Sequence, residues 1–481
     1  MKRAIAVFII LSLLAGGFAV GSREVQKERD FLMGLVANPK NHPDFTIEDI
    51  EEAYTISSTC GELAHLWLSV PWWEEEEQLS SASTQAVITL MRSCGLTPIF
   101  HTNFWELKEV PGEGIVPKLS IPPDMPANTT LASREFRERW ISHVEEICRE
   151  WKPAFYSLGN EVDLFYTYEA NQPDFDNYVS LVAESYDAIK DVSPCTRVMV
   201  IFKMENLMDK HSWFLIDRFQ KEKIDLFGFT SYPYINETYM NEYPSNLPPD
   251  YYAEIPLHTG EVPIAFTEIG WSSSEIVNGN EEKQDAFLQW FLNVTYGMPV
   301  EMICWLFLHD MAPAGKETKA NEMLGLRRHD GEEKAVWQRW RALHDMPCTN
   351  TLPEKPEKPS GALTGKINTP YTYTTSTTDD DGDCLYYLFD WGDGTDSGWI
   401  GPFPSGEMAN ATHEWAEKGE YAIRVKAKDL YGESGWSDGL SISMPLSLLN
   451  GAVLINRLII IFGRTVLYHV PCFNGNSSLE G

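Results

Sequence analysis

The sequence predicts an α/β protein, a (β/α)8 barrel (TIM barrel) followed by a small antiparallel β domain. Two observations predict it. Between residues 28 and 346, short apolar runs alternate eight times with longer amphipathic stretches. After a Pro- and Glu-rich segment, the pattern changes to period-two alternation with Asp-Gly turns. A chain of 481 residues is also too long for one ordinary domain, so two domains are expected.

The predicted strands are near-continuous apolar runs, as expected for parallel strands that are buried on both faces. They are expected at 31–39, 64–73, 97–105, 154–163, 196–204, 224–234, 262–271 and 300–310. Each is followed by a stretch with helical periodicity. An eight-fold alternation of this length favours a closed barrel. An open doubly wound sheet is the alternative, but no GxGxxG loop follows the first strand.

Composition divides the rest of the chain. Residues 1–22 contain two basic residues, an apolar stretch and small residues near its end, which is typical of a signal peptide. An uncleaved anchor is the alternative. Residues 347–366 are a Pro-rich linker, and residues 367–444 form the β domain. The apolar run in residues 445–481 is interrupted by polar residues, so either membrane attachment or a packed tail is expected.

Charge and cysteine content exclude some function classes. The net charge of −32 argues against binding to nucleic acid or to an anionic membrane surface. The eight cysteines include no CxxC pair, so no zinc site is expected, and buried free thiols are at least as expected as disulfides. The acidic run Asp379, Asp380, Asp381 and Asp383 has oxygen ligands that suit calcium, but a solvated turn is the favoured interpretation.

Two of the predicted strands end on a glutamate. The fourth ends in SLGNEVD, which contains Glu161, and the seventh in IAFTEIGWSS, which contains Glu268. Catalytic groups of a (β/α)8 barrel come from the C-terminal ends of its strands, so both carboxyls are expected to face one cleft. Such a pair cleaves a glycosidic bond when one carboxyl donates a proton and the other attacks the anomeric carbon. The alternative is two surface or ion-paired glutamates.

These motifs resemble those of the clan A (β/α)8 glycoside hydrolases, which carry Asn-Glu after the fourth strand and a second Glu after the seventh. FHTNFW and GFTSYPY are similar to strand ends of endo-β-1,4-galactanases, whereas TEIGWSS is more similar to the nucleophile motif of β-1,3-glucanases. The resemblance implies that Glu161 is the general acid/base and Glu268 the nucleophile. It also implies that Asn160 hydrogen-bonds the 2-hydroxyl of the sugar.

Other residues near the predicted strand ends are candidates for substrate contacts. Tyr232 is expected to hydrogen-bond the nucleophile, and Trp305 to lie under the sugar ring; core packing is the alternative for both. The remaining candidates are His101, Asn103 and Trp271, with Trp72 or Trp73 as a stacking platform. Asp163 and Glu205 are nearby acids with no role that the sequence assigns.

The second predicted strand departs from the clan pattern. Many clan A enzymes carry an Arg near the end of this strand that contacts the nucleophile. Here the strand reads AHLWLSVPWW, and His65 is its only basic residue. Without that Arg, the pKa of Glu268 is expected to be less depressed, which would alter or abolish activity.

The β domain has its own resemblance. FDWGDGT and EYAIRVKAKD are similar to the PKD-type immunoglobulin-like β-sandwich, whose members act as spacers or contact carbohydrate or protein.

The sequence therefore predicts a secreted or cell-surface retaining β-glycoside hydrolase that acts on a polysaccharide or oligosaccharide and needs no cofactor or metal. Its rival is a catalytically silent barrel that binds glycans or a partner protein. A transglycosylase would use the same carboxylate pair. The sugar, the linkage, and endo or exo action depend on loops around the cleft.

Overall fold

The computed structural model describes residues 28–444, apart from residues 113, 169–171, 237, 241 and 312–319. The predicted signal peptide and the apolar tail therefore lie outside the described residues. Within the described part, no helix is long and apolar enough to cross a membrane.

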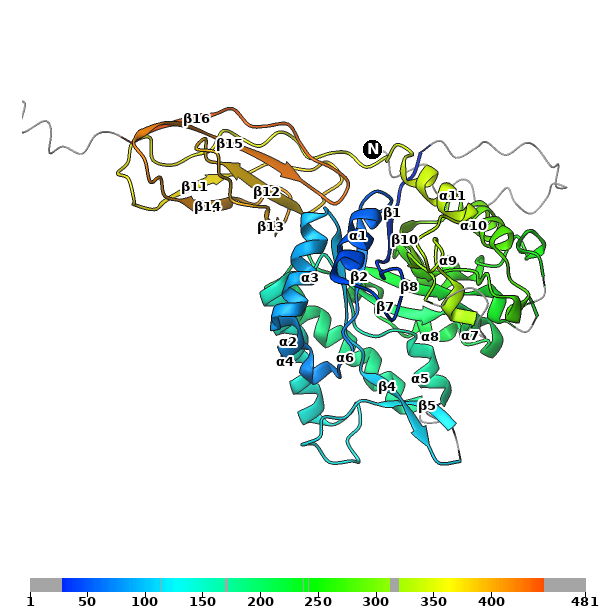
Figure 1. The fold of residues 1–481 in the computed structure, drawn as a ribbon. Helices are drawn as coiled ribbons and strands as arrows, with labels where there is room; N and C mark the ends of the chain where they lie inside the picture. Colours follow the sequence, from blue (N-terminus) through cyan, green and yellow to red (C-terminus); the bar gives the residue numbers. More distant parts are fainter. Residues whose placement is uncertain are drawn as a thin grey trace, which may run out of the picture.

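Eight parallel strands close into a barrel, which confirms the predicted fold class (Figure 1). They are β1 (Leu32–Val36), β2 (Leu63–Leu66), β3 (Thr97–His101), β6 (Phe155–Ser157), β7 (Arg197–Lys203), β8 (Leu226–Ser231), β9 (Ile264–Ile269) and β10 (Val300–Phe307). Each coincides with one of the predicted runs. The observed strands are shorter, because the residues that follow them belong to loops above the barrel.

Helices surround the barrel. They are α1 (Ile47–Ser57), α2 (Glu75–Ser80), α3 (Ala82–Ser93), α4 (Arg134–Trp151), α5 (Val162–Tyr168), α6 (Gln172–Val192), α7 (Met204–Lys210), α8 (Phe214–Asp217), α9 (Glu254–Thr259), α10 (Glu281–Thr295) and α11 (Ala335–His344). Their sequences explain their ends and faces. Thr46 and Asp49 form a capping box at the start of α1. The buried residues of α4 recur at helical spacing, as in Phe136, Trp140 and Val144, so one face packs on the barrel.

The barrel interior has its own apolar core. Every barrel strand contributes to it, and no surrounding helix does. Its buried members are Leu32, Leu63, Ile99, Phe155, Met199, Ile201, Leu226, Ala265, Met302 and Cys304. Most lie in the first half of their strands, so this core fills the N-terminal end of the barrel and leaves the C-terminal end to the functional groups.

The second domain is an antiparallel β-sandwich, as predicted. In one sheet β11 (Tyr371–Thr375) pairs with β14 (Ala409–His413). The other sheet contains β13 (Ile400–Phe403), β12 (Leu385–Asp390), β15 (Gly419–Lys428) and β16 (Leu440–Met444), in that order. Alternate residues of β12 and β15 are buried between the sheets, together with Trp391 and Trp415.

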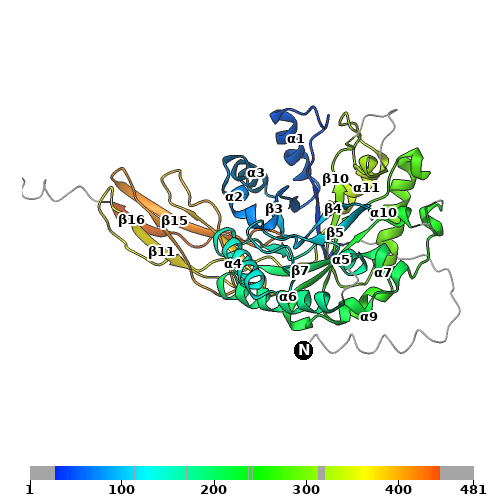
Figure 2. The ribbon, with the colours of Figure 1, turned by 90° about the horizontal axis from the view of Figure 1, so that it is seen from below.

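This domain lies against the N-terminal end of the barrel, away from the strand ends that carry the glutamates. Leu430 and Tyr431, in the loop between β15 and β16, pack on the interior barrel core. A disulfide joins Cys195, just before β7, to Cys384, just before β12. Seen from below, the domain extends to one side of the barrel (Figure 2).

The sequence left disulfides and buried free thiols both open, and the structure contains both. The two partners in the disulfide are 189 residues apart in the sequence, so no local spacing pointed to them. The other described cysteines are free: Cys60, Cys94, Cys148, Cys304 and Cys348.

Candidate active site

Glu268 is the fifth residue of β9, and only 9% of its surface is exposed. Tyr232, which directly follows β8, donates a hydrogen bond from its hydroxyl to Glu268 Oε2 at 2.6 Å. The Asn160 side chain forms a second hydrogen bond with the Glu268 carboxyl. Three separate strand ends therefore meet at this carboxylate, as the sequence predicted for Tyr232.

Glu161 lies on the other side of the site, at the turn between β6 and α5. Its backbone is left-handed, with φ of 49°, a conformation that costs a non-glycine residue about 1 kcal/mol. Its Oε1 accepts a 2.8 Å hydrogen bond from Thr230 Oγ1 and lies 3.2 Å from Lys203 Nζ. Thr230 and Lys203 come from β8 and β7, so the barrel wall holds the carboxyl in place.

The turn that carries Glu161 is fixed by its backbone. The Trp105 ring N–H, from the start of the strand β4 (Trp105–Val110), donates to Asn160 O at 3.0 Å. Asn103 Oδ1 accepts a long 3.4 Å bond from the Asn160 amide. A Cβ at Gly159 would lie 2.6 Å from both Tyr178 and Val162, so only glycine fits there. This close packing accounts for the Gly in SLGNEVD, whereas both bonds at Asn160 use its backbone.

The two carboxyls influence each other. Burial and, after it, the charge of Glu161 raise the pKa of Glu268 from 4.5 to about 7. The Tyr232 hydroxyl, the Lys203 ammonium and the Asn160 side chain oppose that shift and favour the ionised form. The charge of Glu161 therefore acts on Glu268, so the ionisation of the two carboxyls is linked.

A histidine pair links strands two and three. His65 Nδ1, on β2, lies 2.8 Å from His101 Nε2, on β3. Burial lowers the pKa of both imidazoles, that of His65 to about 4, so the pair is neutral near pH 7. No positive charge from this pair therefore offsets the raised pKa of Glu268.

Two predicted substrate contacts are in the core instead. Trp305 has no exposed surface; its ring packs near Phe287 and Trp340, and its N–H donates to Leu324 O at 2.6 Å. Trp271 is equally buried, near Phe287 and Tyr234. Both rings lie among side chains of the surrounding helices and loops, so neither presents a face to a sugar.

Among the paired tryptophans after strand two, Trp72 is also buried, and its N–H donates to Ser120 O. The exposed ring in this region is Trp67, which the sequence analysis missed. It is 40% exposed and lies 5.2 Å from the His65 ring between centroids. The apolar run suggested a strand through this residue, but β2 ends at Leu66, so Trp67 stands on the rim.

Asp163 and Glu205, which had no assigned role, orient the groups around the pair. Asp163 is buried and accepts hydrogen bonds from the Lys203 backbone at 2.7 Å and from Asn206 at 2.6 Å. Glu205 accepts a 2.9 Å bond from the Tyr232 backbone amide and others from Ser231 and Tyr251. Each therefore fixes a residue that contacts a glutamate of the site.

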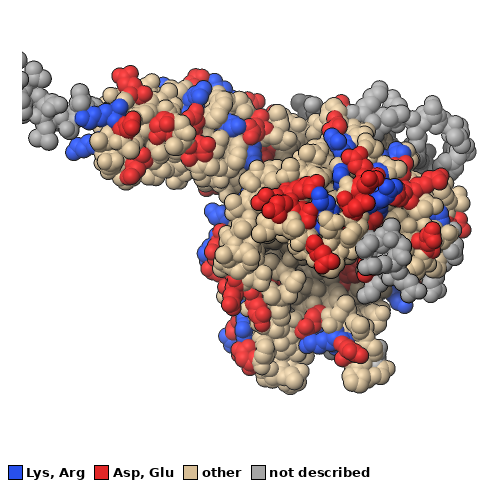
Figure 3. Space-filling view, in the orientation of Figure 1, with Lys and Arg blue, Asp and Glu red and all other residues tan. Residues whose placement is uncertain are grey.

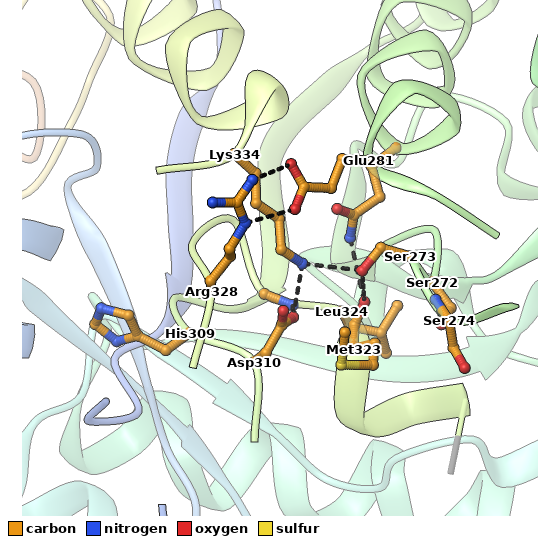
Figure 4. Close-up of polar contacts among 12 residues, drawn as sticks. Ser272, Ser273, Ser274, Glu281, His309, Asp310, Met323, Leu324, Arg328 and Lys334 are labelled. Carbon is orange, nitrogen blue, oxygen red and sulfur yellow. Dashed lines mark hydrogen bonds and ion pairs between the residues drawn. The ribbon is translucent and has the colours of Figure 1, made fainter. Parts of the chain in front are cut away.

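A buried ion pair supports the loops after β9 and β10 (Figure 4). Lys334 Nζ lies 2.7 Å from Asp310 Oδ1 and 3.1 Å from Ser273 Oγ. Asp310 also accepts from the Gly325 amide. Leu324, the residue before Gly325, packs closely on Gly270. A Cβ added to Gly270 would lie 3.0 Å from the Leu324 side chain and 3.5 Å from the Tyr232 ring. The network therefore holds a loop against the tyrosine that binds Glu268.

Replacing Glu268 by Gln is expected to stabilise the protein, and only at high pH. Because burial raises the folded-state pKa above the unfolded 4.5, wild type loses stability as the pH rises from 4.5 through about 7. Gln mimics the protonated form and avoids this loss. Urea unfolding should show a gain of about 2–3 kcal/mol at pH 8 that disappears at pH 4. A gain independent of pH would contradict the shift.

Comparison with protein families gives two matches. Residues 139–285 match Glycosyl hydrolase family 53, a stretch that contains Glu161 and Glu268. Residues 359–437 match the PKD domain. No curated protein matches the chain.

Solved structures give further likenesses. A Bacteroides uniformis β-glucuronidase aligns over 87% of this chain and 46% of its own, with 13% identity and a TM-score of 0.43. An endo-β-1,4-mannanase from Thermotoga petrophila covers 87% of this chain and 98% of its own, with 10% identity and a TM-score of 0.40. The PKD domain of an M14-like peptidase from a Thermoplasmatales archaeon is 44% identical over 20% of this chain and all of its own, with a TM-score of 0.19.

The two family matches fall on the two domains that the structure separates. The first lies within the closed parallel barrel and spans both glutamates, and the second lies within the β-sandwich. The chain therefore joins a closed parallel barrel, part of which matches Glycosyl hydrolase family 53, to a β-sandwich that matches the PKD domain.

Proposed function

We propose that this chain is a retaining β-glycoside hydrolase that cleaves a polysaccharide by double displacement. The observation that carries the proposal is the meeting of Glu161 and Glu268 at the C-terminal end of one barrel, close enough for the charge of one to raise the pKa of the other. In such enzymes one carboxyl attacks the anomeric carbon while the other protonates the leaving oxygen.

In the first step, ionised Glu268 attacks the anomeric carbon and the bond to the leaving oxygen breaks, while Glu161 gives that oxygen its proton. In the second step, Glu161 takes a proton from water, and the water oxygen displaces Glu268 from the sugar. The Tyr232 hydroxyl, at 2.6 Å, and the Asn160 side chain favour the ionised nucleophile. Lys203, beside Glu161, provides a positive charge for the carboxylate that forms there.

The substrate is expected to be a neutral polysaccharide. Acidic side chains are spread over both domains on the face drawn in Figure 3, and the net charge is −32, so a polyanion would be repelled. The resemblance of FHTNFW and GFTSYPY to endo-β-1,4-galactanases makes β-1,4-galactan the first substrate to test. We also propose that the protein works outside the cell, where such polymers are found.

The test is release of reducing sugar from galactan, mannan, xylan and β-1,3- and β-1,4-glucans by the full chain. Turnover of one polymer is expected and would name the substrate. NMR spectroscopy should identify the anomer that is released first. A β anomer would support double displacement. Binding without turnover on every polymer would favour the silent barrel instead.

Trp67→Ala is expected to raise KM for the polymer about five- to ten-fold with little change in kcat. Its ring is exposed on the rim, and an aromatic contact of this kind contributes about 1 kcal/mol. Trp67→Phe should keep most of the affinity. Tyr296→Ala is the control, because Tyr296 is also an exposed aromatic residue but follows α10 at the other end of the barrel. Equal KM values for all variants would exclude a role of the Trp67 ring in binding the polymer.

A further inference from the structure

Three aspartates meet in the PKD domain, far from the glutamate pair. Asp379 and Asp383 belong to the loop between β11 and β12, and Asp429 directly follows β15. One carboxylate oxygen from each lies within 4.8 Å of the others. Only 6% of Asp379 and 3% of Asp429 is exposed, so this is a buried cluster and not a solvated turn.

Each buried aspartate uses one oxygen for the fold and leaves the other unpaired. Asp379 Oδ1 accepts from the amides of Asp381 and Asp383, at 2.9 and 3.1 Å. Asp429 Oδ1 accepts from the amides of Tyr431 and Gly432, at 2.7 and 2.6 Å. The Oδ2 atoms of Asp379 and Asp429 are buried and have no hydrogen-bond partner. The hydrogen bonds from backbone amides hold both carboxylates in place, and the unpaired Oδ2 atoms remain in the cluster.

An asparagine of the linker contacts the cluster. Asn350 Nδ2 lies 2.8 Å from Asp383 Oδ2, and Asn350 Oδ1 is buried without a partner. The amide therefore lies at the edge of the cluster with an unused oxygen. In the described part of the chain, none of the three aspartates forms a salt bridge with a Lys, Arg or His.

Three adjoining carboxylates without a cation are electrostatically unfavourable, because buried charge that is not compensated costs several kcal/mol. Burial and the neighbouring aspartates raise the pKa of Asp379, and that of Asp429 to about 6. A divalent cation would remove this repulsion. The donors are all oxygens, which suit calcium, and they include none of the Cys or His ligands that favour zinc.

We propose that Asp379, Asp383 and Asp429, together with Asn350, bind a calcium ion. The ion would join the linker to two loops that contact the barrel. Asp383 precedes Cys384, whose disulfide partner lies in the barrel, and Asp429 precedes Leu430 and Tyr431, which pack on the barrel core. Calcium would therefore stabilise the junction between the two domains as well as the PKD domain itself.

The test uses the full chain, stripped with EDTA and titrated with CaCl2 in a calorimeter and in thermal unfolding. We expect one ion per chain, a dissociation constant on the order of 10⁻⁴ M or tighter, and a rise in Tm that Mg²⁺ at equal concentration does not match. Asp429→Asn should weaken binding at least ten-fold. Asp380→Asn, which changes an exposed member of the same acidic run, should bind as wild type does.

Asp383→Asn gives a second variant if Asp429→Asn does not fold, since Asp383 is less buried. It should also bind at least ten-fold more weakly. Two results would overturn the proposal. One is no heat and no change in Tm for the wild type at millimolar calcium. The other is an unchanged response in both site variants, which would indicate general attraction to an acidic surface.

Discussion

Glu268→Gln is expected to lower kcat by several orders of magnitude on every substrate, whereas Glu161→Gln should spare only the first step, seen as a burst of phenolate, on substrates with good leaving groups. Without the Glu268 carboxylate no glycosyl–enzyme bond forms, whatever the leaving group. Without Glu161 the first step lacks its acid, worth 10²–10⁴-fold. An aryl glycoside that releases a stable phenolate does not need that proton. Polymer assays and dinitrophenyl glycosides of the same sugar make the comparison.

Glu275→Gln is the matched control, because Glu275 follows β9 in the loop after Glu268 but is exposed. It should turn over both kinds of substrate at the wild-type rate. If Glu161→Gln and Glu268→Gln both retain turnover, the catalytic site lies elsewhere. If Glu161→Gln slows the first step equally on the polymer and on the dinitrophenyl glycoside, the assigned division of roles is wrong.

Lys334→Met is expected to lower the free energy of unfolding by about 3–5 kcal/mol, because it leaves the buried Asp310 without its cation. Both side chains are almost completely inaccessible to solvent. Burial already raises the pKa of Asp310, and Lys334 opposes that shift. In the variant Asp310 should take up a proton, so the loss should shrink at low pH. Urea unfolding at pH 5 and pH 8 measures both effects.

Arg134→Met provides the comparison, because Arg134 pairs with Glu138 on the exposed surface of α4. This substitution should lower the free energy of unfolding by less than 1 kcal/mol. Adding Asp310→Leu to Lys334→Met should recover much of the stability, because no unpaired charge then remains buried. A loss of less than 1 kcal/mol for Lys334→Met alone would show that the ion pair does not support these loops.

The barrel could be predicted because its signals are local and repeated. Each strand is an apolar run, each helix has one apolar face, and eight such units admit few folds. The glutamate pair could be predicted for a related reason: Glu161 and Glu268 each follow such a run, and a closed barrel brings all strand ends together. Tyr232 was expected at the nucleophile by the same argument, and it hydrogen-bonds Glu268.

Other features depend on contacts that sequence order does not reveal. Whether a Trp after a strand faces the cleft or the helices depends on where the strand ends, so Trp67 was missed, and Trp305 was expected in the cleft although it is buried. The roles of Asp163 and Glu205 depend on backbone amides that only the fold brings near. Asp429 lies 50 residues beyond Asp379, and without the β-sandwich nothing links them.

The measurement that tests the central claim most directly is the mass of Glu161→Gln after reaction with a dinitrophenyl glycoside of the preferred sugar. Without its general base, this variant should accumulate the glycosyl–enzyme. Peptide mapping should then place one sugar mass on Glu268. No adduct despite release of phenolate, or an adduct on another residue, would contradict a double displacement through Glu268.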